Sequence, residues 1–210
     1  MPPTAHKNAL TAMILLLLSF AFNCGDRNRN NNDPIPELSF QINPALIEKR
    51  FCDNVLSFSF QPPKGCIPVS MSLFNKAREK IVREYSLDSS FAVEPRNLFL
   101  NQKERLICLV SALPKWPSFP LLLKGYQRAI DEWSKKGDIK TGVFTHRGLE
   151  IRQILTMGRE QVNFKLVILQ SGIHPFQIDY IIPQESYKNN LEAIESSIGS
   201  IEKLKEEEDP

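Results

Sequence analysis

The feature that most constrains the fold is a change of hydrophobic period near Ile139. From there to residue 182, apolar and polar residues alternate with a period of two, which is typical of half-buried strands. Four strands are expected, at residues 141–147, 150–158, 162–171 and 176–182. The linkers between them are at most four residues long, so successive strands must pair with one another. The sequence therefore predicts an antiparallel meander.

The central strands of this meander carry apolar side chains on both faces. Val162, Phe164 and Leu166 point one way, whereas Val167 and Leu169 point the other. A strand that is apolar on both sides is covered on both sides. We therefore expect packing layers above and below the sheet.

Apolar residues recur at spacings of three and four in three further stretches, which predicts helices at 71–85, 119–136 and 185–205. The last helix should bury Leu191, Ile194, Ile198 and Ile201 against the meander. Additional strands are expected at 54–60 and 105–113, and residues 86–97 are expected to be irregular around a proline. This order predicts an α+β fold, an antiparallel sheet flanked by helices.

The N-terminus has the organisation of an export signal. Lys7 precedes an uncharged apolar run at residues 9–22, and Cys24-Gly25 follows. The run has 14 residues, whereas a membrane-spanning helix needs about 20. The sequence predicts a signal peptide at 1–23.

The residues around Cys24 resemble a bacterial lipobox, in which the cysteine thiol receives diacylglycerol. Ala21 and Asn23 occupy positions where the strict pattern has Leu and a small residue, and this departure resembles the looser lipoboxes of spirochaetal lipoproteins. The resemblance implies a fatty-acylated (palmitate-bearing) Cys24; plain secretion and retention as an uncleaved anchor are the alternatives. The expected organisation is a signal peptide at 1–23, a lipidated cysteine and flexible tether at 24–45, a folded domain at 46–205 and an acidic tail at 206–210.

Three cysteines remain after Cys24. An exported protein meets oxidising conditions, so Cys52 and Cys66, which flank an expected strand and turn, are predicted to form a disulfide. Cys108 lies in an apolar strand and is expected to stay reduced. A zinc site is disfavoured because the chain has no close Cys-x-x-Cys pair and no metal-binding histidine spacing. We expect neither a metal nor another cofactor.

No nucleophile or phosphate-binding motif occurs in the sequence. His146 and His174 lie near a strand end and in a turn, and a structural role is favoured for both over a catalytic one. Three aromatic residues near a proline-rich loop are expected to pack in the core rather than to form a ligand platform: Trp116, Phe119 and Trp133. Five basic residues of the meander form either a solvated sheet edge, which we favour, or a docking patch for an acidic partner or a glycan: Lys140, Arg147, Arg152, Arg159 and Lys165.

Two stretches resemble the PsbP-like superfamily, which includes extrinsic photosystem proteins, Ran-binding Mog proteins and many bacterial lipoproteins. Residues 56–65 resemble the family's opening strand with its Pro-Gly ending, and residues 176–183 with the following helix resemble its closing elements. The family usually has Trp where this chain has Cys66. The resemblance spans residues 54–205 and implies an α/β/α sandwich with no shared catalytic residues.

Together these features predict a lipid-anchored lipoprotein of the bacterial cell envelope, at the outer membrane or the periplasmic face of a membrane. It is expected to be a non-catalytic binding or accessory module, monomeric, with an unknown protein partner. The net charge of +2 gives no reason to expect nucleic-acid binding. The alternatives are a surface-exposed, host-interacting lipoprotein and, less favoured, a periplasmic hydrolase.

Overall fold

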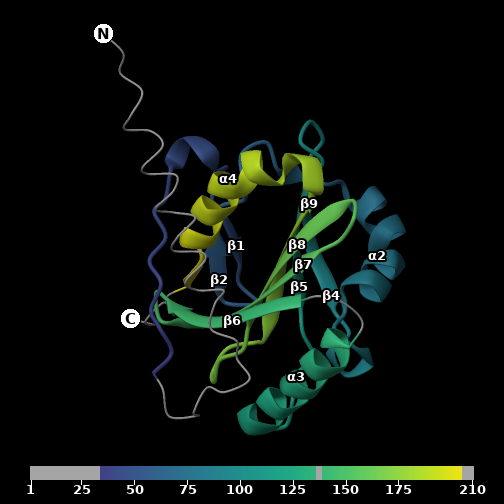
Figure 1. Cartoon of the computed structure of the whole chain (residues 1–210), viewed down its shortest axis with the longest axis vertical. Coiled ribbons are helices and arrows are strands. Elements are labelled where there is room, and N and C mark those ends of the chain that lie inside the picture. Colours follow the sequence, from purple (N-terminus) through teal and green to yellow (C-terminus); the bar gives the residue numbers. More distant parts are fainter. Residues whose placement is uncertain (1–33, 136–138, 205–210) are drawn as a thin grey trace.

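The structure is a computed structural model and describes residues 34–135 and 139–204. Its centre is a seven-stranded sheet in which every neighbouring pair is antiparallel (Figure 1). Its strands, in spatial order, are β3 (Ile67–Pro68), β4 (Glu94–Asn101), β5 (Leu106–Ala112), β9 (Phe176–Pro183), β8 (Gln161–Ile168), β7 (Leu149–Met157) and β6 (Ile139–His146). The predicted meander is confirmed as the run from β6 to β9.

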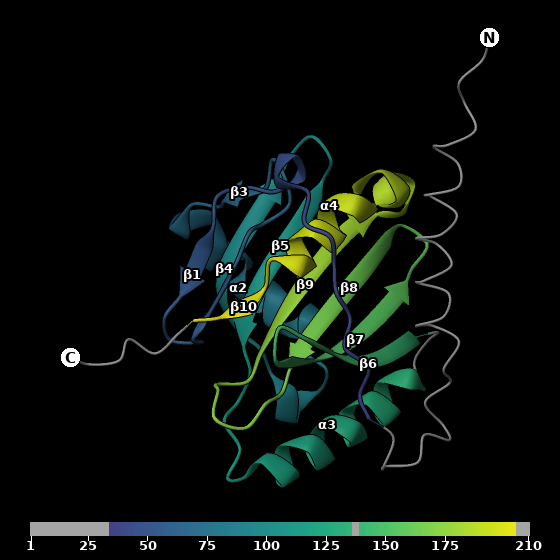
Figure 2. The ribbon, with the colours of Figure 1, turned by 90° about the vertical axis from the view of Figure 1, so that its left-hand side faces the viewer.

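Two layers cover the sheet, as the two-sided strands predict. The helices α2 (Met71–Tyr85) and α3 (Phe119–Ser134) lie on one face. The helix α4 (Tyr187–Gly199) lies on the other, beside a three-stranded sheet (Figures 1 and 2). The strands of that small sheet, in spatial order, are β1 (Phe51–Asp53), β2 (Phe58–Phe60) and β10 (Glu202–Lys203). Three 3₁₀ helices join these elements: η2 (Pro44–Leu46), η3 (Ser89–Phe91) and η4 (Gln184–Ser186). The predicted α+β class, an antiparallel sheet flanked by helices, is confirmed.

The predicted docking of the last helix is confirmed for Ile194, Ile198 and Ile201, whereas Leu191 is only half-buried. The helix is also shorter than expected. Ile194 and Ile198 are buried in the same apolar cluster as Phe176 and Tyr180 of β9. The helix ends at Gly199 rather than at residue 205, because the chain turns there to pair β10 with β2. Among the described residues, no helix is long and apolar enough to span a bilayer.

The strand predicted at 54–60 is wrong in its first half. The Asp53 carboxylate accepts hydrogen bonds from the backbone N–H groups of Val55 and Leu56, both at 3.0 Å, and Ser57 has a φ of 54°. These features turn the chain into a tight hairpin between β1 and β2. Only residues 58–60 continue as a strand.

The irregular segment predicted at 86–97 is also wrong in part, because it contains the start of β4. Pro95 lies inside that strand, and the pairing with β5 shifts between Pro95 and Asn97. A β-bulge tolerates a proline that a regular ladder would not, and it breaks the alternation that would reveal the strand.

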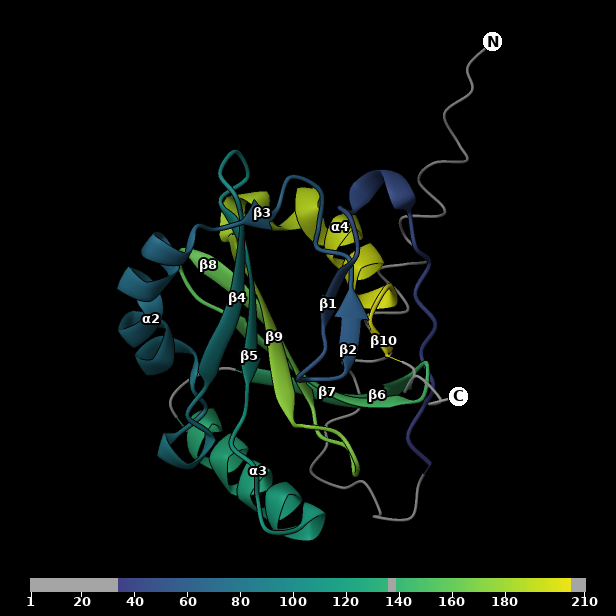
Figure 3. The same ribbon diagram turned by 180° about the vertical axis from the view of Figure 1, so that it is seen from behind.

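The folded domain begins earlier than residue 46, so the prediction of a flexible tether is wrong for residues 36–43. This segment, which we call the N-terminal strap, runs beside β6 and then across to α4 (Figure 3). The N–H of Leu38 donates to the carbonyl of Thr145, and the N–H of Thr145 donates to the carbonyl of Pro36, both at 2.8 Å. The predicted signal peptide, Cys24 and the acidic tail lie outside the described residues.

Candidate functional site

A fully buried ion pair lies on the face of the sheet that α2 and α3 cover. The ammonium nitrogen Nζ of Lys165 lies 2.6 Å from Oδ1 of Asp179, and the two side chains are 1% and 0% exposed. Lys165 on β8 stands directly opposite Asp179 on β9. The same Nζ donates to the carbonyl of Tyr85, at the end of α2, at 2.8 Å. The pair therefore fastens a helix to the centre of the sheet.

Two amide side chains complete this cluster. Gln177 donates from Nε2 to Oδ2 of Asp179 at 2.7 Å and to the Tyr85 carbonyl at 3.2 Å. Asn163 donates from Nδ2 to Oδ1 of Asp179 at 3.2 Å. The carboxylate of Asp179 thus accepts three hydrogen bonds, which compensates for the loss of water around it.

Burial governs the protonation equilibria in this layer. Desolvation lowers the pKa of Lys165, and the nearby carboxylate of Asp179 opposes that shift. Burial, with contributions from Glu84 and Asp179, raises the pKa of Tyr85 to about 12. The Lys165 nitrogen also lies 6.0 Å and 5.9 Å from the ring centroids of Tyr85 and Trp133. An ammonium near aromatic faces is stabilised in its charged form.

The same layer contains hydrogen-bonding groups that are not satisfied. Among the described residues, five buried side-chain atoms have no hydrogen-bond partner: Ser111 Oγ, Trp116 Nε1, Arg152 Nε, Asn163 Oδ1 and Gln177 Oε1. All five belong to the α2 and α3 side. Ser111 stands opposite Gln177, and Arg152 opposite Val167, which packs in the apolar cluster beneath these helices. Trp116 packs against that cluster.

Buried polar atoms in native proteins are almost always paired, with protein groups, ordered water or a bound molecule. The unpaired set offers donors at Arg152 and Trp116 and acceptors at Asn163 and Gln177. Water or a small uncharged molecule that both donates and accepts hydrogen bonds would match these groups chemically, and this polar layer is therefore the candidate site.

The structure corrects the reading of the basic meander residues as a solvated edge. Lys165 is buried, and Arg152 is mostly buried, pairs with Glu150 and lies 5.4 Å above the ring of Tyr126. Arg147 and Arg159 are exposed as expected. Sequence reasoning missed the polar layer because its members lie on separate strands. One signal was available in the sequence. Lys165 and Asp179 each lie seven residues from Gly172, and two residues at equal distances from the centre of a hairpin stand opposite each other.

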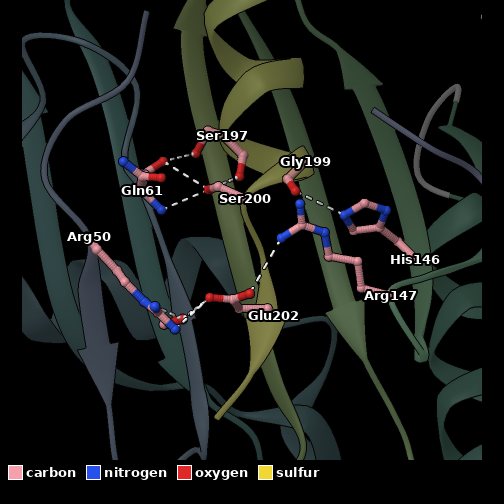
Figure 4. A network of polar contacts seen from close by, with 9 residues as sticks. Arg50, Gln61, His146, Arg147, Ser197, Gly199, Ser200 and Glu202 are labelled. Carbon is pink, nitrogen blue, oxygen red and sulfur yellow. Dashed lines mark hydrogen bonds and ion pairs between the residues drawn. The ribbon is translucent and has the colours of Figure 1, made fainter. Parts of the chain in front are cut away.

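Both described histidines that were weighed as catalytic contact backbone carbonyls. His146, which is 3% exposed, has Nδ1 2.9 Å from the carbonyl oxygen of Leu38 and Nε2 3.1 Å from that of Gly199 (Figure 4). His174 has Nε2 3.1 Å from the carbonyl oxygen of Leu113. His146 therefore links the N-terminal strap to the end of α4, which is a structural role.

The rest of this network ties α4 and β10 to their neighbours. Ser197 donates to the carbonyl of Gln61 at 2.6 Å, and the N–H of Gln61 donates to Ser200 at 2.8 Å (Figure 4). Glu202 bridges Arg50 at 2.5 Å and Arg147 at 3.4 Å. These surface ion pairs contribute little stability, so the buried serine contacts are what fix the helix end.

The predicted Cys52–Cys66 disulfide is not formed, and both thiols are free. Cys52 is exposed on β1, whereas Cys66 is buried and its thiol lies 3.8 Å from the carbonyl oxygen of Leu106. The two thiols thus lie in different environments, one at the surface and one in the core. Cys108 is free and fully buried, and desolvation raises its pKa well above the ordinary value.

The aromatic residues near the proline-rich loop pack against the core. Trp116 stacks on Phe91 with ring centroids 5.3 Å apart, and it lies against Gly125 of α3, where a Cβ would meet its ring at 2.4 Å. Phe119 and Trp133 pack against the same cluster. A separate hollow of about 470 Å³ lies at the surface, where Arg105 pairs with Glu185. It is lined by exposed side chains, and none of its lining residues belongs to the polar layer.

No protein-family model matches the chain, and no curated protein sequence matches it. Cyanobacterial PsbP from Synechocystis sp. PCC 6803 has a similar shape, with a TM-score of 0.41 and 13% identity, over 86% of this chain and 100% of that one. A Bacteroides thetaiotaomicron protein has a TM-score of 0.42 and 13% identity, over 78% of this chain. The chain spans 51% of that protein's length. Both likenesses concern shape alone.

Proposed function

We propose that this protein is a lipid-anchored lipoprotein of the bacterial cell envelope that acts as a non-catalytic binding or accessory module. The observation that carries the proposal is Cys24, which follows a short apolar run after the single residue Asn23 and precedes an asparagine-rich spacer. Two or three acyl chains on one cysteine hold a protein at a membrane, whereas one chain holds it only marginally.

The beginning of the folded domain supports an anchoring role. The N-terminal strap joins the domain through two backbone hydrogen bonds at Thr145 and through the contact between His146 and Leu38. Phe40 adds ring contacts to Phe144 and His146, with centroids 5.7 Å and 5.3 Å apart. A tether attached at residue 34 would therefore be continuous with a segment that is held on the sheet.

The polar layer supports a binding role. Its unpaired donors and acceptors favour water or a small uncharged hydrogen-bonding molecule between the sheet and the helices α2 and α3. We further propose that the domain is PsbP-like, on the quoted strand-and-turn patterns, and that its signal is of the spirochaetal type.

Palmitate labelling tests the anchor. Cells expressing the full chain, its Cys24→Ser variant or its Cys52→Ser variant are grown with a labelled palmitate and then fractionated. The wild type should carry the label and sediment with membranes. The Cys52→Ser variant should do the same, because the exposed thiol that it lacks is not the acylated one. Cys24→Ser should lose both properties. Label and membrane association that survive in Cys24→Ser would overturn the proposal.

Protease treatment of intact cells then decides between a surface protein and a periplasmic one. A protein that is digested in intact cells faces outward, which is the host-interacting alternative. A protein that is protected until the outer membrane is opened faces the periplasm.

A further inference from the structure

The two outermost strands of the seven-stranded sheet are protected differently against pairing with another chain. β3 has two residues and ends in Pro68, which has no N–H to donate. β6 has eight residues, and within residues 34–135 and 139–204 the N-terminal strap forms its backbone hydrogen bonds to the outer edge of β6 at Thr145. Within that part of the chain, the outward backbone groups of residues 139, 141 and 143 are not bonded.

The bonds at Thr145 show which backbone groups face this edge. Thr145 uses its N–H and its C=O for the strap, so the odd-numbered residues of β6 turn both groups outward. Ile139, Thr141 and Val143 share that orientation, and in the described structure their outward groups have no hydrogen-bond partner. None of the three is charged or a proline, and the charge within this stretch is that of Lys140. Natural sheets normally use charge, proline or a bulge to protect such an edge.

We propose that this edge binds the same edge of a second copy of the chain. The two β6 strands pair antiparallel over residues 139–143 about a twofold axis at Thr141, which joins two seven-stranded sheets into one. Thr141 then stands opposite the Thr141 of its partner copy, Ile139 opposite Val143, and Lys140 opposite Gly142.

In this register, residues 139–143 of one copy match the same residues of the other copy. This match is the reason why we favour a second copy of the chain as the partner. The two apolar residues meet each other, and the two threonines can hydrogen-bond across the axis. Each lysine faces a glycine, which has no side chain, so no like charges oppose. Each of the three outward-facing pairs exchanges two backbone hydrogen bonds. The inference does not depend on the lipid anchor, and it departs from the monomer expected from the sequence.

Cysteine cross-linking tests the twofold register on the full chain. In a Cys52→Ser background, Thr141→Cys places a thiol at the axis, and Val55→Cys places one at a remote site that is 60% exposed. Residues in a hydrogen-bonded antiparallel pair have Cα atoms about 5.5 Å apart, inside the range of about 4.4–6.8 Å that a disulfide spans. Mild oxidation of the cell fraction that holds the protein should give a covalent dimer with Thr141→Cys and not with Val55→Cys. Equal dimer yields from the two variants would contradict the proposal.

A charge variant shows that the dimer forms through this edge. Gly142 has an open position, because a Cβ there would meet no atom within 4 Å. Gly142→Lys, added to Thr141→Cys, puts lysine opposite Lys140 on both sides of the axis and should abolish the covalent dimer. Gly142→Ala is the matched control and should retain it. A dimer that persists in Gly142→Lys, or that is lost equally in Gly142→Ala, would overturn the register.

Discussion

Lys165 and Asp179 are the residues whose environment departs furthest from what their chemistry favours. Both are removed from water in the middle of a sheet, and each depends on the other and on Gln177, Asn163 and the carbonyl of Tyr85. Burying an ion pair costs free energy because both charges lose water. Removing one partner destabilises a protein more than replacing both partners by apolar residues, since it leaves one buried charge without compensation. The role of this pair is therefore to hold the end of α2 at a fixed position on the sheet.

We predict that Lys165→Met lowers the free energy of unfolding by about 3–5 kcal/mol, because it leaves the Asp179 carboxylate buried without its cation. The double variant Lys165→Met with Asp179→Leu should recover a large part of this loss, because no charge stays buried. Urea denaturation followed by circular dichroism measures both. A single variant as stable as wild type, or a double variant less stable than the single one, would contradict the account.

Asp88 gives a prediction that depends on pH. Desolvation raises the pKa of its carboxyl, but hydrogen bonds from Ser90 and Phe91 and the charge of Arg128 outweigh it, so the pKa is lowered. A lowered pKa in the folded state stabilises the protein at pH values above the unfolded pKa of about 3.9, and this contribution is lost as the pH falls through the folded pKa. Asp88→Ala also removes an N-cap, so it should cost about 1 kcal/mol near neutral pH.

The difference in unfolding free energy between wild type and Asp88→Ala should therefore shrink between pH 7 and about pH 3. Asp88→Asn is the control, since it keeps an acceptor for the cap without the charge, and it should cost less than Asp88→Ala. A difference that is constant across this pH range would mean that the charge of Asp88 does not contribute.

At the scale of elements, the close contact between the N-terminal strap and the end of α4 depends on a glycine. A Cβ at Gly199 would meet Cβ of Phe40 at 2.9 Å and its carbonyl oxygen at 3.1 Å. We predict that Gly199→Ala destabilises the protein by about 1–3 kcal/mol, the usual cost of overpacking. Gly142→Ala, where the added carbon meets nothing, should change the melting temperature little. Hydrogen exchange at Leu38 should rise only in Gly199→Ala, and unchanged exchange there would argue against a strap held by this contact.

The docking of α4 gives a second prediction at this scale. Ile194 and Ile198 are 0% and 3% exposed, and replacing a buried isoleucine by alanine costs about 2–5 kcal/mol. Each variant should melt clearly below wild type in differential scanning calorimetry. Leu73→Ala removes comparable side-chain volume at a site that is 60% exposed, so it should melt like wild type. If all three melt alike, α4 is not part of the core.

Helices and strands with an uninterrupted hydrophobic period could be predicted from the sequence. Segments whose conformation depends on residues far away in the sequence could not. The strands β6 to β9 and the helix α2 follow their patterns closely. The strand β4 was missed because a bulge beside Pro95 breaks its alternation. The N-terminal strap was missed although Leu38, Phe40 and Ile42 alternate with polar residues, because its partner Thr145 lies 109 residues from Pro36. The polar layer was missed for the same reason, since strand pairing assembles it.

At the scale of the whole molecule, the fold is three layers, and each layer has its own kind of contact. On one face, apolar packing and the serine contacts of Ser197 and Ser200 hold α4 and the small sheet. The other face combines apolar packing with the polar layer beneath α2 and α3. The N-terminal strap attaches the beginning of the domain at the edge of the sheet.

The N-terminal peptide of the protein isolated from membranes tests this account most directly. Mass spectrometry of that peptide reads the cleavage site and the modification together. The account predicts a peptide that begins at Cys24 and carries the mass of a thioether-linked diacylglycerol. A peptide that begins at Met1, or one in which Cys24 is unmodified, would contradict it.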